Sequence, residues 1–222
     1  MTRVVSLFLP NWSTDRLRRK AGDAAPPTEA PLVLIGRDGK RRVVLAADAA
    51  AQAGGLRAGM PVTKAQVLAR GLIVQDADPA ADAEALERLA VWLFRYAPIV
   101  APDPPDGLII DSTGADHLHG GEAVMLDGLI GRLAMSGITA RAAIADTWGA
   151  AHALARFSAQ PTVIAPKGHD PSVLERLPLE ALRVPAPVIT TLRTLGFRTV
   201  GDLLAQPRAP LTLRFGPELG RR

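Results

Sequence analysis

Carboxylates and imidazoles gather in one short stretch near the middle of the chain. Carboxylates bind hard cations such as Mg²⁺, and histidine pairs bind softer metals. Two of the side chains, His117 and His119, alternate on a segment that we expect to be extended, but no cysteine and no third ligand accompany them. Successive strand residues point to opposite faces, so neighbouring acids do not converge on one ion. The stretch contains Asp103, Asp106, Asp111, Asp116, His117 and His119.

Asp106 has two interpretations. It is either the remnant of a metal site or an ordinary loop acid between prolines and Gly107, because turns favour aspartate whatever the chemistry. The tryptophans at positions 12, 92 and 148 are too scattered to form a base-stacking platform, so we expect core or sheet-covering roles for them.

The amino-acid composition limits the classes of protein to which this chain can belong. The chain has 222 residues, 48% apolar and 22% charged, enough for more than one compact unit. It has no cysteine, which excludes disulfides, thiolate zinc sites and cysteine nucleophiles and suits a reducing cytoplasm. The apolar run from Val4 to Leu9 is too short for a membrane span and lacks a cleavage site after it. We therefore expect a soluble protein with no membrane contact.

The net charge of +4 is mild, but basic residues concentrate at the C-terminal end. Such a bias favours an anionic partner, although it also fits a plain solvated face. From residue 193 onward the arginines are Arg193, Arg198, Arg208, Arg214, Arg221 and Arg222, against the acids Asp202 and Glu218.

The elements that would position these residues follow from periodicity. The run from Val4 to Leu9, ended by Pro10, predicts a buried strand. Residues 78–96 carry apolar side chains at three- and four-residue spacing, which predicts an amphipathic helix. With residues 21–77 set aside, the order is strand, helix, strand, strand, helix, strand, which is the pattern of an α+β ferredoxin-like sheet. From about residue 170, short helices broken by proline and glycine predict a second, all-α domain.

Several segments together resemble the Y-family translesion DNA polymerases, the UmuC-like group. Residues 30–34, 43–46 and 55–61, the last reading Gly-Leu-Arg-Ala-Gly-Met-Pro, are similar to the fingers of that family, and residues 108–114 look like a palm strand. The resemblance covers residues 3 to about 216. It implies a palm at 1–20 and 78–165 with a fingers insertion at 21–77. It also implies a helix-hairpin-helix thumb at 166–222, truncated, with a little finger and a C-terminal tail beyond.

Active members of that family hold two metal ions with three carboxylates, which neutralise the triphosphate and activate the attacking hydroxyl. By the same register those positions are Pro10, Asp106 and Gly107. At best one ligand of three remains. The resemblance is therefore to a catalytically degenerate branch of the family, with no catalytic residues, only a vestigial Asp106 and no metal cofactor.

The resemblance also marks the triphosphate positions. Where the family offers Tyr, Arg and Lys, this chain has Ala49, Gln52 and Gln160. Without cations at these positions, nucleotide binding loses its electrostatic basis.

The thumb hairpin would grip a phosphate backbone through amide groups at a helix start, without reading sequence. Here it reads Pro185-Ala186-Pro187, and each proline removes one donor. A second turn, Arg214-Phe215-Gly216, keeps a glycine. The expected DNA contacts are Arg183, Ala186, Arg193, Arg198, Arg208, Arg214 and Gly216.

The resemblance implies a non-catalytic, DNA-binding scaffold subunit in SOS-type translesion synthesis and DNA repair, in the bacterial cytoplasm at the nucleoid. Its partners would be primer-template DNA and, through the missing C-terminal region, a sliding clamp and an error-prone replicative-type polymerase. One alternative is an active translesion polymerase with a rearranged Mg²⁺ site. Another is a protein-interaction module that never touches DNA.

Overall fold

The structure is a computed structural model that describes residues 2–168 and 170–221; Met1, His169 and Arg222 lie outside the described residues. Its larger sheet has five strands in the order β5-β6-β1-β7-β8. The strands are β1 (Val4–Phe8), β5 (Ile99–Asp103), β6 (Gly107–Asp111), β7 (Arg141–Ala145) and β8 (Thr162–Ile164).

The central strand β1 pairs antiparallel with both β6 and β7. One crossover joins β1 to β5 through α4 (Pro79–Leu93), and the other joins β6 to β7 through α5 (Glu122–Met135). This arrangement confirms the predicted α+β, ferredoxin-like sheet. The edge strand β8, parallel to β7, was not predicted.

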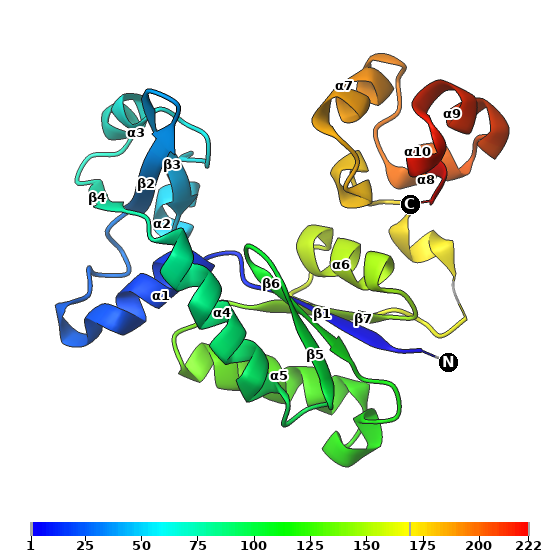
Figure 1. Cartoon of the computed structure of the whole chain (residues 1–222), viewed down its shortest axis with the longest axis horizontal. Helices are drawn as coiled ribbons and strands as arrows, with labels where there is room; N and C mark the ends of the chain where they lie inside the picture. The colour runs from blue at the N-terminus through cyan, green and yellow to red at the C-terminus, as the bar shows by residue number, and fades with distance from the viewer. Residues whose placement is uncertain (1, 169, 222) are drawn as a thin grey trace.

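Helices cover both faces of this sheet (Figure 1). On one face α4 and α5 bury leucines such as Leu86 and Leu129 against Leu7 of β1. The N-terminus of α4 is capped by Asp78, whose side chain accepts a hydrogen bond from the Ala81 amide. The helix α1 (Trp12–Ala21) lies beside α4. On the other face α6 (Trp148–Phe157) packs an alanine-rich surface on β1 and β7.

The insertion after α1 forms a second sheet of order β3-β2-β4. Its third strand was not predicted, and its second helix begins at Val62, directly after Pro61. The elements are η1 (Gly22–Ala24), β2 (Leu32–Asp38), β3 (Arg41–Ala47), α2 (Ala49–Ala53), α3 (Val62–Leu68) and β4 (Ile73–Asp76).

The C-terminal part is a set of short helices around a small leucine-rich core that includes Leu179, Leu192 and Leu203. No helix in the described residues is long and apolar enough to cross a membrane. The elements are η3 (Pro171–Leu174), η4 (Leu179–Leu182), α7 (Ala186–Thr194), α8 (Val200–Leu204), α9 (Arg208–Phe215) and α10 (Pro217–Arg221).

The segment with the paired histidines is the short helix η2 (Asp116–His119), so the expected extended conformation is wrong. A 3₁₀ turn points neighbouring side chains in different directions, and His119 lies within hydrogen-bond distance of the Tyr96 carbonyl, at 3.1 Å. The two imidazoles therefore do not form a metal pair by strand alternation.

A buried arginine joins β1 to its neighbours. Arg3 is only 4% exposed. Its guanidinium donates to both carboxylate oxygens of Glu122, at 2.6 and 2.8 Å, and to Asp146 at 2.8 Å. It also donates to the Ala165 carbonyl at 3.0 Å. One side chain thus connects the start of β1, the first turn of α5, the segment after β7 and the segment after β8.

Replacing Arg3 by leucine should lower the free energy of unfolding by about 3–5 kcal/mol, because the buried Asp146 carboxylate and the partly buried Glu122 carboxylate lose their charged partner. Denaturant unfolding followed by circular dichroism measures this. The exposed Arg37→Leu substitution is the control and should change stability by less than about 0.5 kcal/mol. A loss for Arg3→Leu as small as the control's would show that the buried network contributes little.

Candidate functional site

The three positions that the resemblance assigns to metal ligands meet at one end of the sheet. Phe8 pairs with Gly107 across β1 and β6, and the Leu9 amide donates to the Asp106 carbonyl at 2.8 Å. Pro10 follows directly on the chain. A proline ring, a glycine and one carboxylate therefore lie where the family places three acids.

An arginine from α6 occupies this end of the sheet. The Arg156 guanidinium donates to Asp106 Oδ1 at 2.8 Å and lies 3.7 Å from Asp103 Oδ2. It also covers the Phe8 ring, 4.6 Å from its centroid, as a cation–π contact. The His152 imidazole, one helical turn earlier, has its Nε2 3.8 Å from the same oxygen of Asp103. The guanidinium of Arg156 thus places a positive charge beside Asp103 and Asp106.

Burial raises the pKa of the Asp106 carboxyl above its ordinary value, and the neighbouring negative charge of Asp103 adds to the rise. The charge of Arg156 and its hydrogen bond act in the opposite direction and keep the pKa from rising further. Arg156 is therefore the group that stabilises the ionised form of this acid.

These residues do not fit a pair of Mg²⁺ ions. Mg²⁺ takes oxygen ligands in octahedral geometry, and Asp106 offers one carboxylate that already binds a guanidinium. No group of three potential metal ligands exists in residues 2–168 and 170–221. A dication beside Asp106 would also face the positive charge of Arg156.

Gly107 leaves no room for a side chain. A Cβ built there would lie 2.9 Å from an Arg156 nitrogen and 3.1 Å from the carbonyl oxygens of both Leu7 and Asp103. The arginine tip can move, but those two oxygens belong to the paired strands around the site. The position of the third acid is closed by backbone as well as by the arginine.

Two of the three triphosphate positions, Ala49 and Gln52, lie three residues apart on α2, whereas Gln160 follows α6. Ala49 is the exposed first residue of α2. The Gln52 side chain donates to the Ala47 carbonyl at 2.7 Å and to Asn11 Oδ1 at 3.1 Å, which connects the fingers to the start of α1. Gln160 accepts a hydrogen bond from Arg141 through its backbone carbonyl, at 3.0 Å. None of the three side chains carries a charge.

The first thumb hairpin offers few donors. Pro185 precedes α7, Pro187 has no amide hydrogen, and the amides of Val188 and Ile189 both donate to the Pro185 carbonyl. Within the described residues this leaves the amide of Ala186 as the one donor of the first turn available to a phosphate. In the second turn, Gly216 has φ +83°, a conformation that favours glycine.

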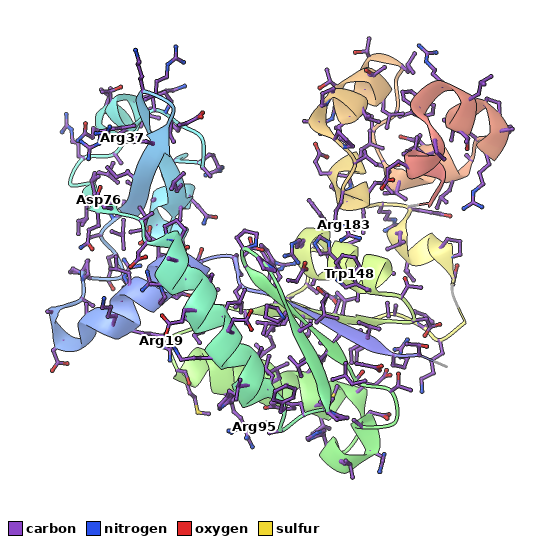
Figure 2. All side chains as sticks on the ribbon, viewed as in Figure 1. Arg19, Arg37, Asp76, Arg95, Trp148 and Arg183 are labelled. Atoms are coloured by element: carbon purple, nitrogen blue, oxygen red, sulfur yellow. The ribbon has the colours of Figure 1, made fainter. Side chains whose placement is uncertain are left out.

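The predicted thumb arginines differ in their surroundings. Arg183 lies 3.8 Å from the Trp148 ring centroid and stacks on a palm residue, as Figure 2 shows. Arg193 pairs with Glu180, and Arg198 donates to the Arg193 carbonyl at 2.7 Å. Arg214 is exposed and lies over the Phe215 ring at 5.8 Å. The exposed arginines can reach a phosphate more readily than Arg183.

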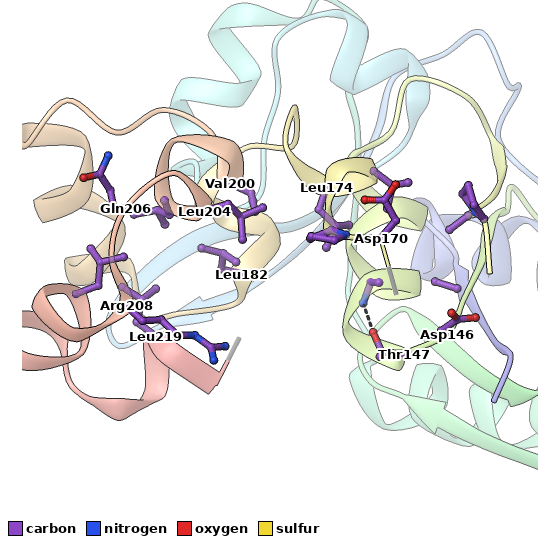
Figure 3. A pocket seen from close by; sticks show the side chains of 18 residues that line it. Asp146, Thr147, Asp170, Leu174, Leu182, Val200, Leu204, Gln206, Arg208 and Leu219 are labelled. Carbon is purple, nitrogen blue, oxygen red and sulfur yellow. Dashed lines mark hydrogen bonds between the residues drawn. The ribbon is translucent and has the colours of Figure 1, made fainter. Parts of the chain in front are cut away.

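An apolar cavity of about 660 Å³ separates the palm from the thumb (Figure 3). Its walls include Ala150 of α6 on one side and Val200 and Leu204 of α8 on the other. Its acid Asp146 already binds Arg3, and Thr147 caps α6. The junction between the two parts is thus loosely filled.

Comparison with known proteins places the chain. The sequence pattern of the impB/mucB/samB family matches residues 25–156. The chain belongs to this family. Protein ImuB of Caulobacter vibrioides (strain NA1000 / CB15N) is 50% identical over 162 residues, which cover 73% of this chain and 35% of that protein. DNA polymerase IV of Dehalococcoides mccartyi (strain CBDB1) is 30% identical over 194 residues, covering 85% of this chain and 49% of that protein.

The fold of this impB/mucB/samB chain is shared with solved polymerases. DinB from Sulfolobus solfataricus matches with a TM-score of 0.76 at 18% identity, over 96% of this chain and 63% of that one. An insertion ternary complex of Dbh DNA polymerase matches with a TM-score of 0.79 at 17% identity, over 99% and 67%. The chain is an ImuB-like homologue of Y-family polymerases and spans about a third of ImuB and half of DNA polymerase IV.

Sequence reasoning missed Arg156, although a signal was present. His152 and Arg156 lie four residues apart, so their side chains share one face of α6. This helix covers one face of the sheet. Their acidic partners, Asp103 and Asp106, lie about fifty residues earlier in the sequence. Patterns among neighbouring residues do not reveal a contact over that separation.

Replacing Gly107 by alanine should destabilise this impB/mucB/samB chain by about 1–3 kcal/mol, because the added methyl group meets two carbonyl oxygens. The control is Gly128→Ala on the exposed side of α5, where nothing lies within 4 Å of the new Cβ. That change should stabilise the chain by roughly 0.5–1 kcal/mol, as alanine is the better helix former. Equal thermal shifts for the two variants would contradict the closed site.

Replacing Arg156 by leucine should raise the pKa of Asp106 further, since both of its lowering influences are removed. A carboxyl whose folded pKa is raised contributes stability below its unfolded pKa, and this contribution disappears as pH rises through the folded pKa. In the Arg156→Leu variant, the stability that the protonated Asp106 carboxyl contributes is therefore lost at a higher pH than in the parent chain. Carboxyl-carbon NMR titration measures the shift, with Arg37→Leu as control; an unchanged or lowered pKa would refute the role of Arg156.

Proposed function

We propose that this chain is the palm, fingers and thumb part of a protein that binds primer-template DNA without extending it and acts as a scaffold in translesion synthesis. The observation that carries the proposal is the ion pair of Arg156 with Asp106, together with the closed position at Gly107. Nucleotidyl transfer by this fold depends on metal-bound carboxylates, and here the remaining carboxylate binds an internal cation instead.

DNA contact is proposed for the thumb. Exposed arginines and the turn at Gly216 supply sequence-independent contacts to phosphate, which suit a protein that must hold damaged as well as intact template. The prolines of the first hairpin leave it one donor, so the arginines carry most of the interaction. We infer a weak, salt-sensitive grip.

Partners and location remain part of the same proposal. Because the chain spans about a third of the ImuB relative, contacts with a sliding clamp and an error-prone replicative-type polymerase are proposed for the whole protein and are not assigned to residues of this chain. SOS-dependent expression, a role in mutagenesis and action at the bacterial nucleoid, in the cytoplasm, follow from the resemblance alone.

Primer extension tests the loss of catalysis. The full chain, incubated with primer-template, nucleotides and Mg²⁺ or Mn²⁺, should add no nucleotide above background, because Asp106 is paired with Arg156 and positions 10 and 107 carry no acid. A catalytically active Y-family polymerase is the positive control. Incorporation that Asp106→Ala abolishes would overturn the proposal in favour of a polymerase with a rearranged metal site.

Fluorescence anisotropy with a labelled primer-template tests DNA binding. Log affinity should fall with log salt at a slope of about −0.7 to −0.9 per phosphate contact. The double variant Arg193→Gln/Arg214→Gln should bind more weakly with a shallower slope, by roughly two contacts. The control pair Arg95→Gln/Arg132→Gln makes the same charge change just after α4 and on α5, and it should bind as the parent does. Binding that is absent at low salt would instead favour a pure protein-interaction module.

A further inference from the structure

A basic groove of about 370 Å³ lies between α1 and α4 and the C-terminal end of α5. It is on the face of the sheet that α4 and α5 cover, whereas α6 and Arg156 lie on the other face. Four cationic side chains line it and no carboxylate does: Arg16, Arg19, Lys20 and Arg88. Figure 2 shows Arg19 at this junction.

The side chains of two of these cations make no ion pair or hydrogen bond within the described part of the chain. Arg16 pairs with Asp82, and Arg88 pairs with Glu84 on its own helix. Arg19 and Lys20 are exposed. The carboxylate of Asp15, one helical turn before Arg19, interacts with the charge of Arg19, but it is buried and accepts a hydrogen bond from the Thr139 amide at 2.7 Å. The exposed rim of the groove therefore presents an excess of positive charge.

The floor of the groove is apolar. It includes Leu89 and Trp92 of α4, Leu133 of α5 and the following Ile138. These side chains give the groove an apolar base beneath its cationic rim.

The aromatic side chains of the groove are not arranged for nucleic-acid bases. Bases stack on an open aromatic face. Trp12 is 3% exposed, and its indole N–H donates to the Asp82 carbonyl at 3.0 Å. One face of Trp92 is covered by the Arg95 guanidinium, 4.4 Å from the ring centroid. An apolar floor with a cationic rim instead complements a peptide that carries acidic residues around an apolar anchor.

We propose that this groove binds an acidic amphipathic segment of a protein partner. Carboxylates of the segment pair with Arg19 and Lys20, and one or two apolar side chains lie on the floor near Leu89 and Trp92. The contact is independent of DNA binding by the thumb and of the palm chemistry, because it uses none of their residues.

Phage display of random dodecapeptides against the full chain tests the groove, with counter-selection on the variant Arg19→Glu/Lys20→Glu. Enriched peptides should combine Asp and Glu with an apolar anchor. By fluorescence anisotropy, labelled copies should lose about tenfold or more in affinity on the variant. The matched control Arg37→Glu/Lys40→Glu reverses the same charges on the exposed fingers hairpin and should bind as the parent does.

Ala85→Leu supplies a second test without a change of charge, since it narrows the floor between α1 and α4 and should weaken the same peptides. Circular dichroism confirms that each variant folds. The proposal fails if enrichment yields no acidic peptides, or if the enriched peptides bind the groove variant and the hairpin control equally. It also fails if labelled oligo-dT loses affinity on the groove variant while the peptides do not, which would make the groove a nucleic-acid site.

Discussion

The structure depends on a central strand that is hydrogen-bonded along both edges. Because β1 pairs with β6 and β7 at once, neither end of it can shift without breaking a ladder. An arginine lies at each end. Arg3 holds Glu122 and Asp146 at the start, and Arg156 holds Asp106 where the strand finishes. The doubly paired strand thus fixes the end of the sheet at which Arg156 binds Asp106.

Under the proposed function, the ion pair of Arg156 with Asp106 explains how the palm keeps its fold without polymerase chemistry. The acids of a metal site repel one another and require cations, so the loss of the metals alone would leave a buried, unbalanced charge. Arg156 balances Asp106 from within the chain, and Gly107 and Pro10 remove the other two charges. The sheet is then stable without ligand and can serve as a frame for the fingers and the thumb.

Local patterns in the sequence predict much of this fold. The apolar run at Val4–Phe8, its proline stop and the Asp78 cap of α4 are visible because they are short-range signals. The edge strands β4 and β8 were missed, since they are short and carry few buried side chains. The loss of acids at positions 10 and 107 was predicted from the alignment with the family. The contacts of Arg3 and Arg156 join residues more than forty positions apart, so they are recognised only in the folded chain.

The stacking of Arg183 on Trp148 has a consequence for observing the molecule. This contact spans the palm and the thumb, next to a cavity that leaves the junction room to move. Separation of the two parts would uncover the indole and let water reach it, and indole emission shifts with the polarity of its surroundings. Trp148 therefore reports the position of the thumb without an attached dye, once the emission of Trp12 and Trp92 is removed by replacing them with phenylalanine.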